Sequence, residues 1–225
     1  MIVNERIVSY IHSLEKSNGP LLDEMEAYAK ENRVPIIRKE VESFLRVLLE
    51  MQHPTHILEL GTAIGYSAIL MGGCIDENSR ITTIENYEKR IPIARENIKN
   101  AGMEDKITVV QGDALEEMKK MPDASVDFIF MDAAKAQYVH YLKEAVRLMK
   151  KGAVLVADNV FQEGDLIESR YIVTRRDRTI HSRMREYLKM IKEEEQLVTT
   201  IVPMGDGLTC LLYTSPSPRD GATSR

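Results

Sequence analysis

The feature that most constrains the fold is a regular alternation of short apolar runs with longer helical stretches between residues 56 and 157. The apolar runs, which predict buried strands, are His56–Leu60, Arg80–Ile84, Ile107–Val110, Val126–Met131 and Ala153–Ala157. The stretches that predict helices are Tyr66–Gly73, Tyr87–Ala101, Ala114–Lys120 and Ala136–Met149. Because apolar strands that alternate with helices are typical of βαβ units, the pattern predicts an α/β fold with a Rossmann-like, doubly wound, mostly parallel sheet.

Helices are expected before this alternation and a hairpin after it. Amphipathic patterns at Ile2–Leu14, Leu21–Asn32 and Arg38–Met51 predict an N-terminal helical part over about residues 1–52. Another helix is predicted from Arg175 to about Glu195. The apolar runs Leu197–Val202 and Leu208–Tyr213 then flank a Gly-Asp-Gly turn, which predicts an antiparallel last strand.

These patterns predict one domain over residues 1–213. The remaining segment, 214–225, has no apolar face, so we expect it to be disordered, and its composition suggests a non-native origin. The two cysteines, Cys74 and Cys210, lie far apart and show no metal-ligand spacing, which fits a reducing compartment. No signal-peptide stretch or membrane-spanning run is present, so the sequence predicts a soluble, cytoplasmic protein without a membrane partner.

Polar and small residues follow the first three predicted strands, at the sheet edge where ligands bind in such folds. Gly61 and Gly65 bracket the first turn with GxxxG spacing, which argues against the GxGxxG of a dinucleotide site. Glu85 follows the second strand and suits ribose hydroxyls, and Asp113-Ala114 follows the third and suits an adenine amino group. Alone, the glycine pair is equally consistent with a tight turn, and a solvated loop position is the better explanation of Glu85, but the three features together indicate an adenosine-type ligand.

The fourth and fifth strands end in oxygen donors. Asp132 follows the fourth strand, with Lys135 three residues later, and Asp158-Asn159 follows the fifth. Two carboxylates and an amide at one sheet edge suit a hard divalent cation such as Mg²⁺. A turn residue followed by a helix cap is the structural alternative for Asp158-Asn159. The five histidines show no ligand spacing and are expected at the surface or at helix caps.

Read in order, ELGTAIGYS, the Glu85 strand, GDA, MDAAK and ADN resemble the metal-dependent catechol and caffeoyl-CoA O-methyltransferase family, which is a class I methyltransferase family. The resemblance runs from about Val34 to Thr209. It is greatest to the bacterial branch that includes tRNA 5-hydroxyuridine methyltransferases, through Val34-Pro35-Ile36-Ile37 and the wording TAIGYSA. The resemblance implies an S-adenosylmethionine-dependent and Mg²⁺-dependent O-methyltransferase that forms a homodimer.

The resemblance also implies roles for individual residues. The S-adenosylmethionine site would comprise Ile37, Gly61, Ser67, Glu85, Asp113, Ala114 and Asp132. The metal would be bound by Asp132, Asp158 and Asn159, with Lys135 and Asp132 in the catalytic role. A bound cation lowers the pKa of a phenol-like hydroxyl and fixes its position, and a lysine beside it can take the proton or stabilise the oxyanion.

The acceptor has two alternatives. Segment 170–185 contains six arginines, which suit phosphate backbones, so tRNA is one expected partner, with 5-hydroxyuridine of the anticodon loop methylated to 5-methoxyuridine. A solvated helix face is the simpler explanation of the same arginines. The other expected acceptor is therefore a small catechol-like molecule with two adjacent oxygens. A non-catalytic adenosine-binding protein is a third reading, disfavoured by the Asp, Lys and Asn residues at the fourth and fifth strand ends.

Overall fold

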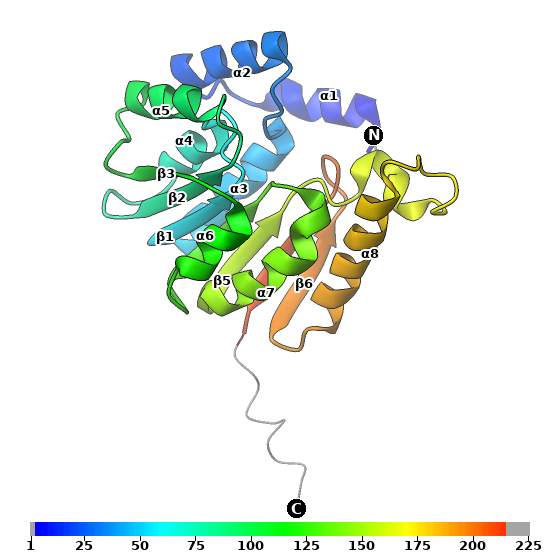
Figure 1. Ribbon diagram of the computed structural model, residues 1–225. Coiled ribbons are helices and arrows are strands. Elements are labelled where there is room, and N and C mark those ends of the chain that lie inside the picture. Colours follow the sequence, from blue (N-terminus) through cyan, green and yellow to red (C-terminus); the bar gives the residue numbers. More distant parts are fainter. Residues whose placement is uncertain (1–2, 215–225) are drawn as a thin grey trace, which may run out of the picture.

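The computed structural model of the chain describes residues 3–214 (Figure 1). Within this range, seven strands form one sheet in the order β3-β2-β1-β4-β5-β7-β6. The strands are β1 His56–Leu60, β2 Arg80–Glu85, β3 Ile107–Gln111, β4 Val126–Met131, β5 Met149–Ala157, β6 Leu197–Val202 and β7 Leu208–Tyr213. Strands β1 to β5 are all parallel, whereas β7 lies between β5 and β6 and is antiparallel to both. The predicted Rossmann-like sheet and its antiparallel last strand are confirmed.

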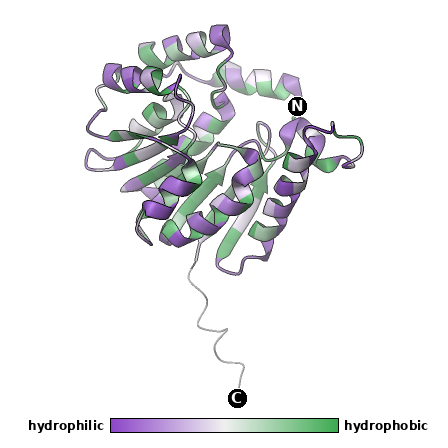
Figure 2. Ribbon diagram, in the orientation of Figure 1, coloured by the Kyte–Doolittle hydropathy of each residue, from purple (hydrophilic) through white to green (hydrophobic). Residues whose placement is uncertain are grey.

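Helices cover both faces of the sheet. They are α1 Glu5–Leu14, α2 Pro20–Asn32, α3 Lys39–Gln52, α4 Tyr66–Gly72, α5 Ile91–Asn100, α6 Ala114–Lys120, α7 Tyr138–Leu148 and α8 Arg178–Glu193, with 3-10 turns η1 Lys135–Gln137 and η2 Gln162–Ile167. Alternate side chains of β4 pack against the helices on opposite faces of the sheet, because strand side chains alternate in direction. Phe128 and Phe130 pack in the core with α3 to α5, and Ile129 and Met131 pack with α6 to α8. Figure 2 shows the apolar strands between helices whose outer faces are polar.

Some element boundaries differ from the sequence predictions. Strand β5 begins at Met149, where a helix was expected to end, because Met149 pairs with Val126 across a bulge despite the polar residues that follow it. Helix α5 begins at Ile91 instead of Tyr87, with Pro92 in its first turn, where the missing N–H costs nothing. The turn η2 was not predicted, and its interior departs from helical geometry at Glu163 and Gly164.

Two of the histidines correct the expectation of surface positions. His56 is buried and bonds to the Ser125 carbonyl and the Thr82 hydroxyl, and His181 is buried against the Glu168 carbonyl. No helix within residues 3–214 is long and apolar enough to cross a membrane. The predicted disordered tail lies outside the described residues, except for Thr214, whose backbone N–H donates to the Gln196 carbonyl at 2.7 Å.

Candidate active site

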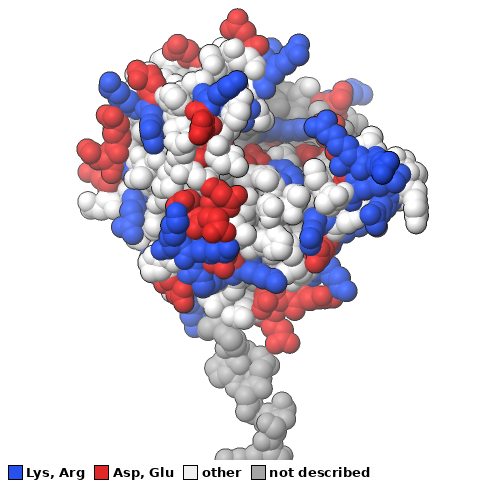
Figure 3. All heavy atoms as spheres, in the orientation of Figure 1, with Lys and Arg blue, Asp and Glu red and all other residues white. Residues whose placement is uncertain are grey.

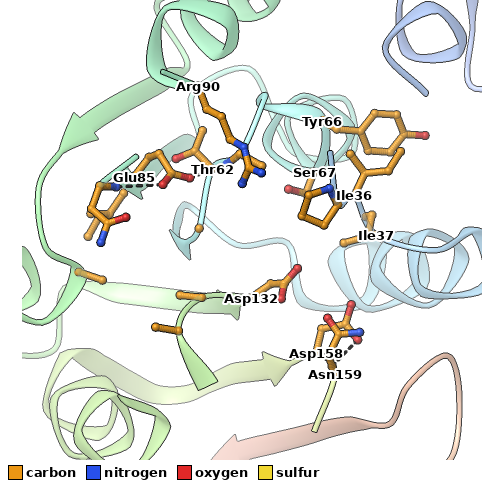
Figure 4. A pocket seen from close by; sticks show the side chains of 18 of the residues that line it. Ile36, Ile37, Thr62, Tyr66, Ser67, Glu85, Arg90, Asp132, Asp158 and Asn159 are labelled. Atoms are coloured by element: carbon orange, nitrogen blue, oxygen red, sulfur yellow. Dashed lines mark hydrogen bonds between the residues drawn. The ribbon is translucent and has the colours of Figure 1, made fainter. Parts of the chain in front are cut away.

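A cavity of about 540 Å³ opens at the carboxyl ends of β1, β2, β4 and β5, next to the point where the strand order reverses between β1 and β4. This is where α/β sheets bind ligands. The sequence-predicted site residues that line it are Ile37, Gly61, Ser67, Glu85, Ala114, Asp132, Lys135, Asp158 and Asn159. Figure 4 shows Glu85 on one side of the cavity, Asp158 and Asn159 on the other, and Asp132 between them.

Gly61 brings the β1 turn against the end of β4. Its φ is +98°, and a Cβ at this position would overlap the backbone carbonyl oxygen of Asp132. The Asp132 N–H donates to the Leu60 carbonyl at 2.9 Å, which holds the two strand ends together. Glycine is therefore required here for both its backbone conformation and its lack of a side chain, and the cavity floor is built from main chain.

The Glu85 carboxylate is fixed by the backbone around it. Its Oε2 accepts from the Ala63 N–H at 2.8 Å, and its Oε1 accepts from the N–H groups of Asn86 and Tyr87 at 3.0 and 2.8 Å. A carboxylate has about four acceptor positions, so one remains for a ligand. Because Glu85 is almost fully buried at the end of β2, its carboxylate is oriented before any ligand arrives.

Of the residues at the end of β3, some line the cavity and one does not. Gly112 and Ala114 line the cavity, whereas Asp113 is not among the lining residues. The Asp113 carboxylate caps α6 by accepting from the Glu116 N–H at 3.1 Å. In this arrangement Asp113 fixes the start of α6, and the backbone on either side of it faces the cavity.

Behind the cavity lies a buried carboxyl that the sequence interpretation did not single out. Glu59 is fully buried in β1, and burial raises its pKa to about 7, against the lowering effect of the Ser67 and Thr83 hydroxyls. Thr83 donates to Glu59 at 2.5 Å and is 2.6 Å from the hydroxyl of Thr62, which lines the cavity. The chain Glu59–Thr83–Thr62 therefore connects the core of the sheet to the cavity wall.

Lys135 joins the ends of β4 and β5. Its Nζ lies 2.6 Å from Oδ1 of Asp132 and 3.4 Å from Oδ1 of Asn159. The ammonium also donates to the Tyr138 hydroxyl at 3.1 Å and the Asp158 carbonyl at 3.2 Å. Tyr138 is fully buried and bonds to the Met131 carbonyl, so it gives the lysine a fixed partner.

The donor set fits a hard divalent cation. Burial, and then the nearby charge of Asp132, raise the pKa of Asp158 to about 7, because two carboxylates share this corner with one lysine. Within residues 3–214 no group of three or more His, Cys, Asp or Glu side chains is placed to bind a metal, so any cation here would take an amide oxygen or ligand oxygens beside the two carboxylates. Asn159 supplies an amide oxygen from a left-handed backbone conformation with a φ of +56°. Two carboxylates with an amide, and with room for ligand oxygens, match what Mg²⁺ prefers.

The cavity also contains residues that sequence reasoning missed. Arg38, Thr62, Tyr66 and Arg90 all line it. Thr62 and Tyr66 each follow a glycine of the motif ELGTAIGYS, so closer attention to the positions after its glycines was the available signal. The Tyr66 hydroxyl donates to the buried carboxylate of Glu42 at 2.8 Å, which ties the motif to α3. Arg38 and Arg90 carry no comparable signal, because isolated arginines near helix starts are usually solvated.

The sheet order, the antiparallel β7 and a cavity at the strand ends together define a Rossmann-like protein of the methyltransferase type. Residues 12–213 match the O-methyltransferase family, and the chain belongs to that family. The membership confirms the family to which the motifs pointed, and not the tRNA specificity of one branch.

Individual relatives agree with this assignment. A catechol O-methyltransferase from Niastella koreensis is 34% identical over 128 residues, which cover 56% of this chain and 58% of that protein, so less than two thirds of its length is matched. Tapetum-specific methyltransferase 1 from Arabidopsis thaliana is 29% identical over 169 residues, covering 74% of this chain and 72% of that protein. The structure of the O-methyltransferase from Bacillus cereus in complex with SAH is 26% identical, with a TM-score of 0.81 over 93% of this chain and 97% of that one.

Proposed function

We propose that this protein transfers the methyl group of S-adenosylmethionine to a hydroxyl oxygen. The observation that carries the proposal is one cavity with a pre-oriented Glu85 carboxylate on one side and Asp158 and Asn159 on the other (Figure 4). Lys135 bonds to Asp132 and Asn159 at that second side. Glu85 suits the ribose hydroxyls, and the Gly61 backbone, Ser67, Ala114, Asp132 and Ile37 surround the remaining cofactor. The structure of the B. cereus relative is a complex with SAH, the demethylated form of this cosubstrate.

We assign the acceptor oxygen to the Lys135 end of the cavity. The side chains that would hold Mg²⁺ there are Asp132, Asp158 and Asn159, and the cation would lower the pKa of the acceptor hydroxyl and fix its position. As an ammonium held by Tyr138, Lys135 stabilises the oxyanion, and only as the neutral amine could it take the hydroxyl proton. Methyl transfer is an in-line displacement, so the rate depends on how precisely the two sides of the cavity hold their ligands.

For the acceptor we propose 5-hydroxyuridine in the anticodon loop of tRNA, which would become 5-methoxyuridine. Its 5-hydroxyl and neighbouring carbonyl supply the two adjacent oxygens that this site suits. In Figure 3 basic side chains gather over the loop before α8, beside a hollow in the surface. That loop also carries Tyr171, which is 86% exposed, and an exposed aromatic side chain among cations is suited to stacking on an unpaired base.

The structure divides the six arginines of segment 170–185 into two groups. Arg178 donates to the carbonyls of Val173 and Tyr171, Arg185 donates to the Leu166 carbonyl, and Arg183 pairs with Glu186. Within residues 3–214, the side chains of the other three, Arg170, Arg175 and Arg176, form no ion pair or hydrogen bond, and all three are exposed. Arg178 and Arg185 bond to backbone carbonyls of the segment before α8, Arg183 pairs within α8, and the three exposed arginines are available for phosphates.

A small catechol-like acceptor is the second candidate, and one observation favours it: the N. koreensis relative is described as a catechol O-methyltransferase. Catechols also carry two adjacent oxygens. The expected homodimer and the absence of a membrane partner stay predictions, since neither the fold nor the cavity depends on them.

The test offers both acceptors in parallel. The purified protein is incubated with labelled S-adenosylmethionine and Mg²⁺, with tRNA from cells that lack 5-methoxyuridine or with catechol, each with and without EDTA. EDTA-sensitive label recovered as 5-methoxyuridine supports the tRNA proposal. Label in catechol alone supports the small-molecule alternative, and label in neither contradicts the proposed activity.

A further inference from the structure

Arg38 lies where two cavities meet. It precedes α3 as its N-cap residue, in the connector Pro35-Ile36-Ile37-Arg38, which lines the main cavity. The same four residues also line a second cavity of about 380 Å³ on the side of α2, together with His12, Lys30 and Lys39. The connector is therefore a shared wall, and Arg38 is the cationic residue of that wall.

Arg38 lies on the side of the main cavity that we assign to the methyl acceptor. Its Cδ lies 3.6 Å from the Cβ position of Gly205 in the turn between β6 and β7. That turn is hydrogen-bonded to the residues just after Asn159, since Val160 N–H donates to the Gly207 carbonyl at 3.0 Å and Phe161 N–H donates to that of Asp206 at 2.9 Å. The Arg38 side chain thus approaches the same end of the cavity as Asn159 and Lys135, away from Glu85.

The Arg38 guanidinium has no partner among residues 3–214, whereas its neighbour Lys39 does. Lys39 is 2.6 Å from Glu26 and 3.5 Å from Glu42. Two carboxylates on which the Arg38 charge acts already accept backbone hydrogen bonds: Asp206 from the Glu163 N–H at 2.6 Å, and Asp158 from the Asn159 N–H at 2.6 Å. A third carboxylate, that of Glu40, contacts the His12 ring at 2.6 Å through Oε2. Arg38 is also partly buried, so five N–H donors on the cavity wall have lost part of their water without gaining a protein acceptor.

We propose that Arg38 is a specificity-determining residue that binds an anionic group of the methyl acceptor, a carboxylate or a phosphate placed beside the oxygen that is methylated. The planar guanidinium matches both groups through paired N–H donors. The proposal rests on the proposed O-methyl transfer, but not on the choice between tRNA and a small acceptor. A phosphate next to the modified nucleoside and the carboxylate of an aromatic acid are two sources of the same chemistry.

The test compares charged and neutral acceptors of the same core. One pair is 3,4-dihydroxybenzoate and catechol, and the other is 5-hydroxyuridine 5′-monophosphate and 5-hydroxyuridine. Arg38→Gln is expected to raise KM for the charged member about 10- to 100-fold, the loss of a charge-assisted pair, and to leave KM for the neutral member within about twofold. Arg38→Lys should recover part of the loss. The pair that responds identifies the source of the anion.

Lys30→Gln is the matched control, because Lys30 lines only the second cavity. Equal losses for charged and neutral members, or an equal effect of Lys30→Gln, would overturn the proposal. Calorimetric binding of the same four compounds to the protein loaded with SAH and Mg²⁺ gives a readout that needs no turnover. A wild type that does not favour the charged member of either pair, including one that binds neither, also overturns it. The proposed activity is judged separately, by whether any acceptor is methylated.

Discussion

The Lys135 ammonium lies 2.6 Å from Oδ1 of Asp132, and this contact joins the residue at the end of β4 to the turn that starts η1. The same ammonium reaches Asn159 at the end of β5. The Lys135 ammonium therefore holds together the oxygen donors at the ends of β4 and β5. The ammonium offsets part of the charge repulsion between the Asp132 and Asp158 carboxylates at this corner of the cavity.

The first prediction concerns Lys135. Lys135→Met is expected to lower kcat by about 100- to 10,000-fold, the usual contribution of a positioned proton-transfer group. The dissociation constant for S-adenosylmethionine should change little, because Lys135 lies at the acceptor end of the cavity. Lys143→Met, an exposed lysine of α7, is the control. An unchanged kcat would remove Lys135 from the mechanism.

Glu85 gives a prediction about cofactor affinity. Glu85→Gln keeps the size of the side chain but loses the charge and an acceptor, so Ala63, Asn86 and Tyr87 lose part of their anchor. We expect the dissociation constant for SAH to rise about 10-fold or more, measured by calorimetry. Glu88→Gln, at an exposed position on the same loop, should leave it unchanged. A normal affinity in Glu85→Gln would argue against ribose binding at this residue.

Gly61 is predicted to be irreplaceable for a steric reason. Gly61→Ala combines a positive φ with an overlap against the Asp132 carbonyl, and should cost at least about 2 kcal/mol of unfolding free energy. Gly152 also has a positive φ, of +85°, but nothing lies within 4 Å of its Cβ position. Gly152→Ala should therefore cost only about 1 kcal/mol. Urea denaturation of the two variants separates crowding from backbone strain, and equal losses would show that crowding is not the cause.

The sequence predicted which residues lie at the strand ends better than it predicted what those residues contact. Apolar runs locate β1 and β4 to the residue, since buried parallel strands tolerate few polar positions. The start of β5 was missed because the apolar run begins only at Ala153, after Lys150 and Lys151, although a backbone pair needs no apolar side chain. Motif spacing led to Asp132 and Asp158. The predicted start of α6 at Ala114 is also correct, so the position of Asp113 before it was the available signal for its role as a helix cap.

The arginines show more clearly that sequence patterns do not predict side-chain contacts. Arg175 and Arg178 look alike in the sequence, yet only Arg178 lies near free carbonyl oxygens of the loop. Whether an arginine is structural or available is decided by backbone atoms that come from other turns of the fold. Periodicity contains no information about such contacts, and the same reason hid Arg38, whose surroundings come from the β6–β7 turn.

This division of the loop predicts a selective effect on RNA. The double variant Arg175→Ala and Arg176→Ala should weaken tRNA binding about 10-fold or more at physiological salt. It should also lower the slope of log affinity against log salt by about 0.7 for each lost phosphate contact. Turnover of catechol should stay unchanged, because neither side chain lines the cavity. Arg183→Ala, which removes a residue paired with Glu186, is the control. An equal fall in catechol turnover would indicate a damaged loop.

The last prediction follows from the buried Glu59. Burial raises its folded-state pKa to about 7 from the ordinary value of 4.5, so the folded protein holds a proton that the unfolded chain releases. The contribution of Glu59 to the unfolding free energy is therefore greatest below about pH 4.5. It falls by up to about 3 kcal/mol as the pH rises to about 7. Glu59→Gln carries no such charge and can still accept from Thr83. Without cofactor, it should match the wild type near pH 4.5 and exceed its unfolding free energy by about 2–3 kcal/mol at pH 8, measured by urea denaturation. A difference that does not change between these pH values would mean that Glu59 is ionised in the folded protein throughout.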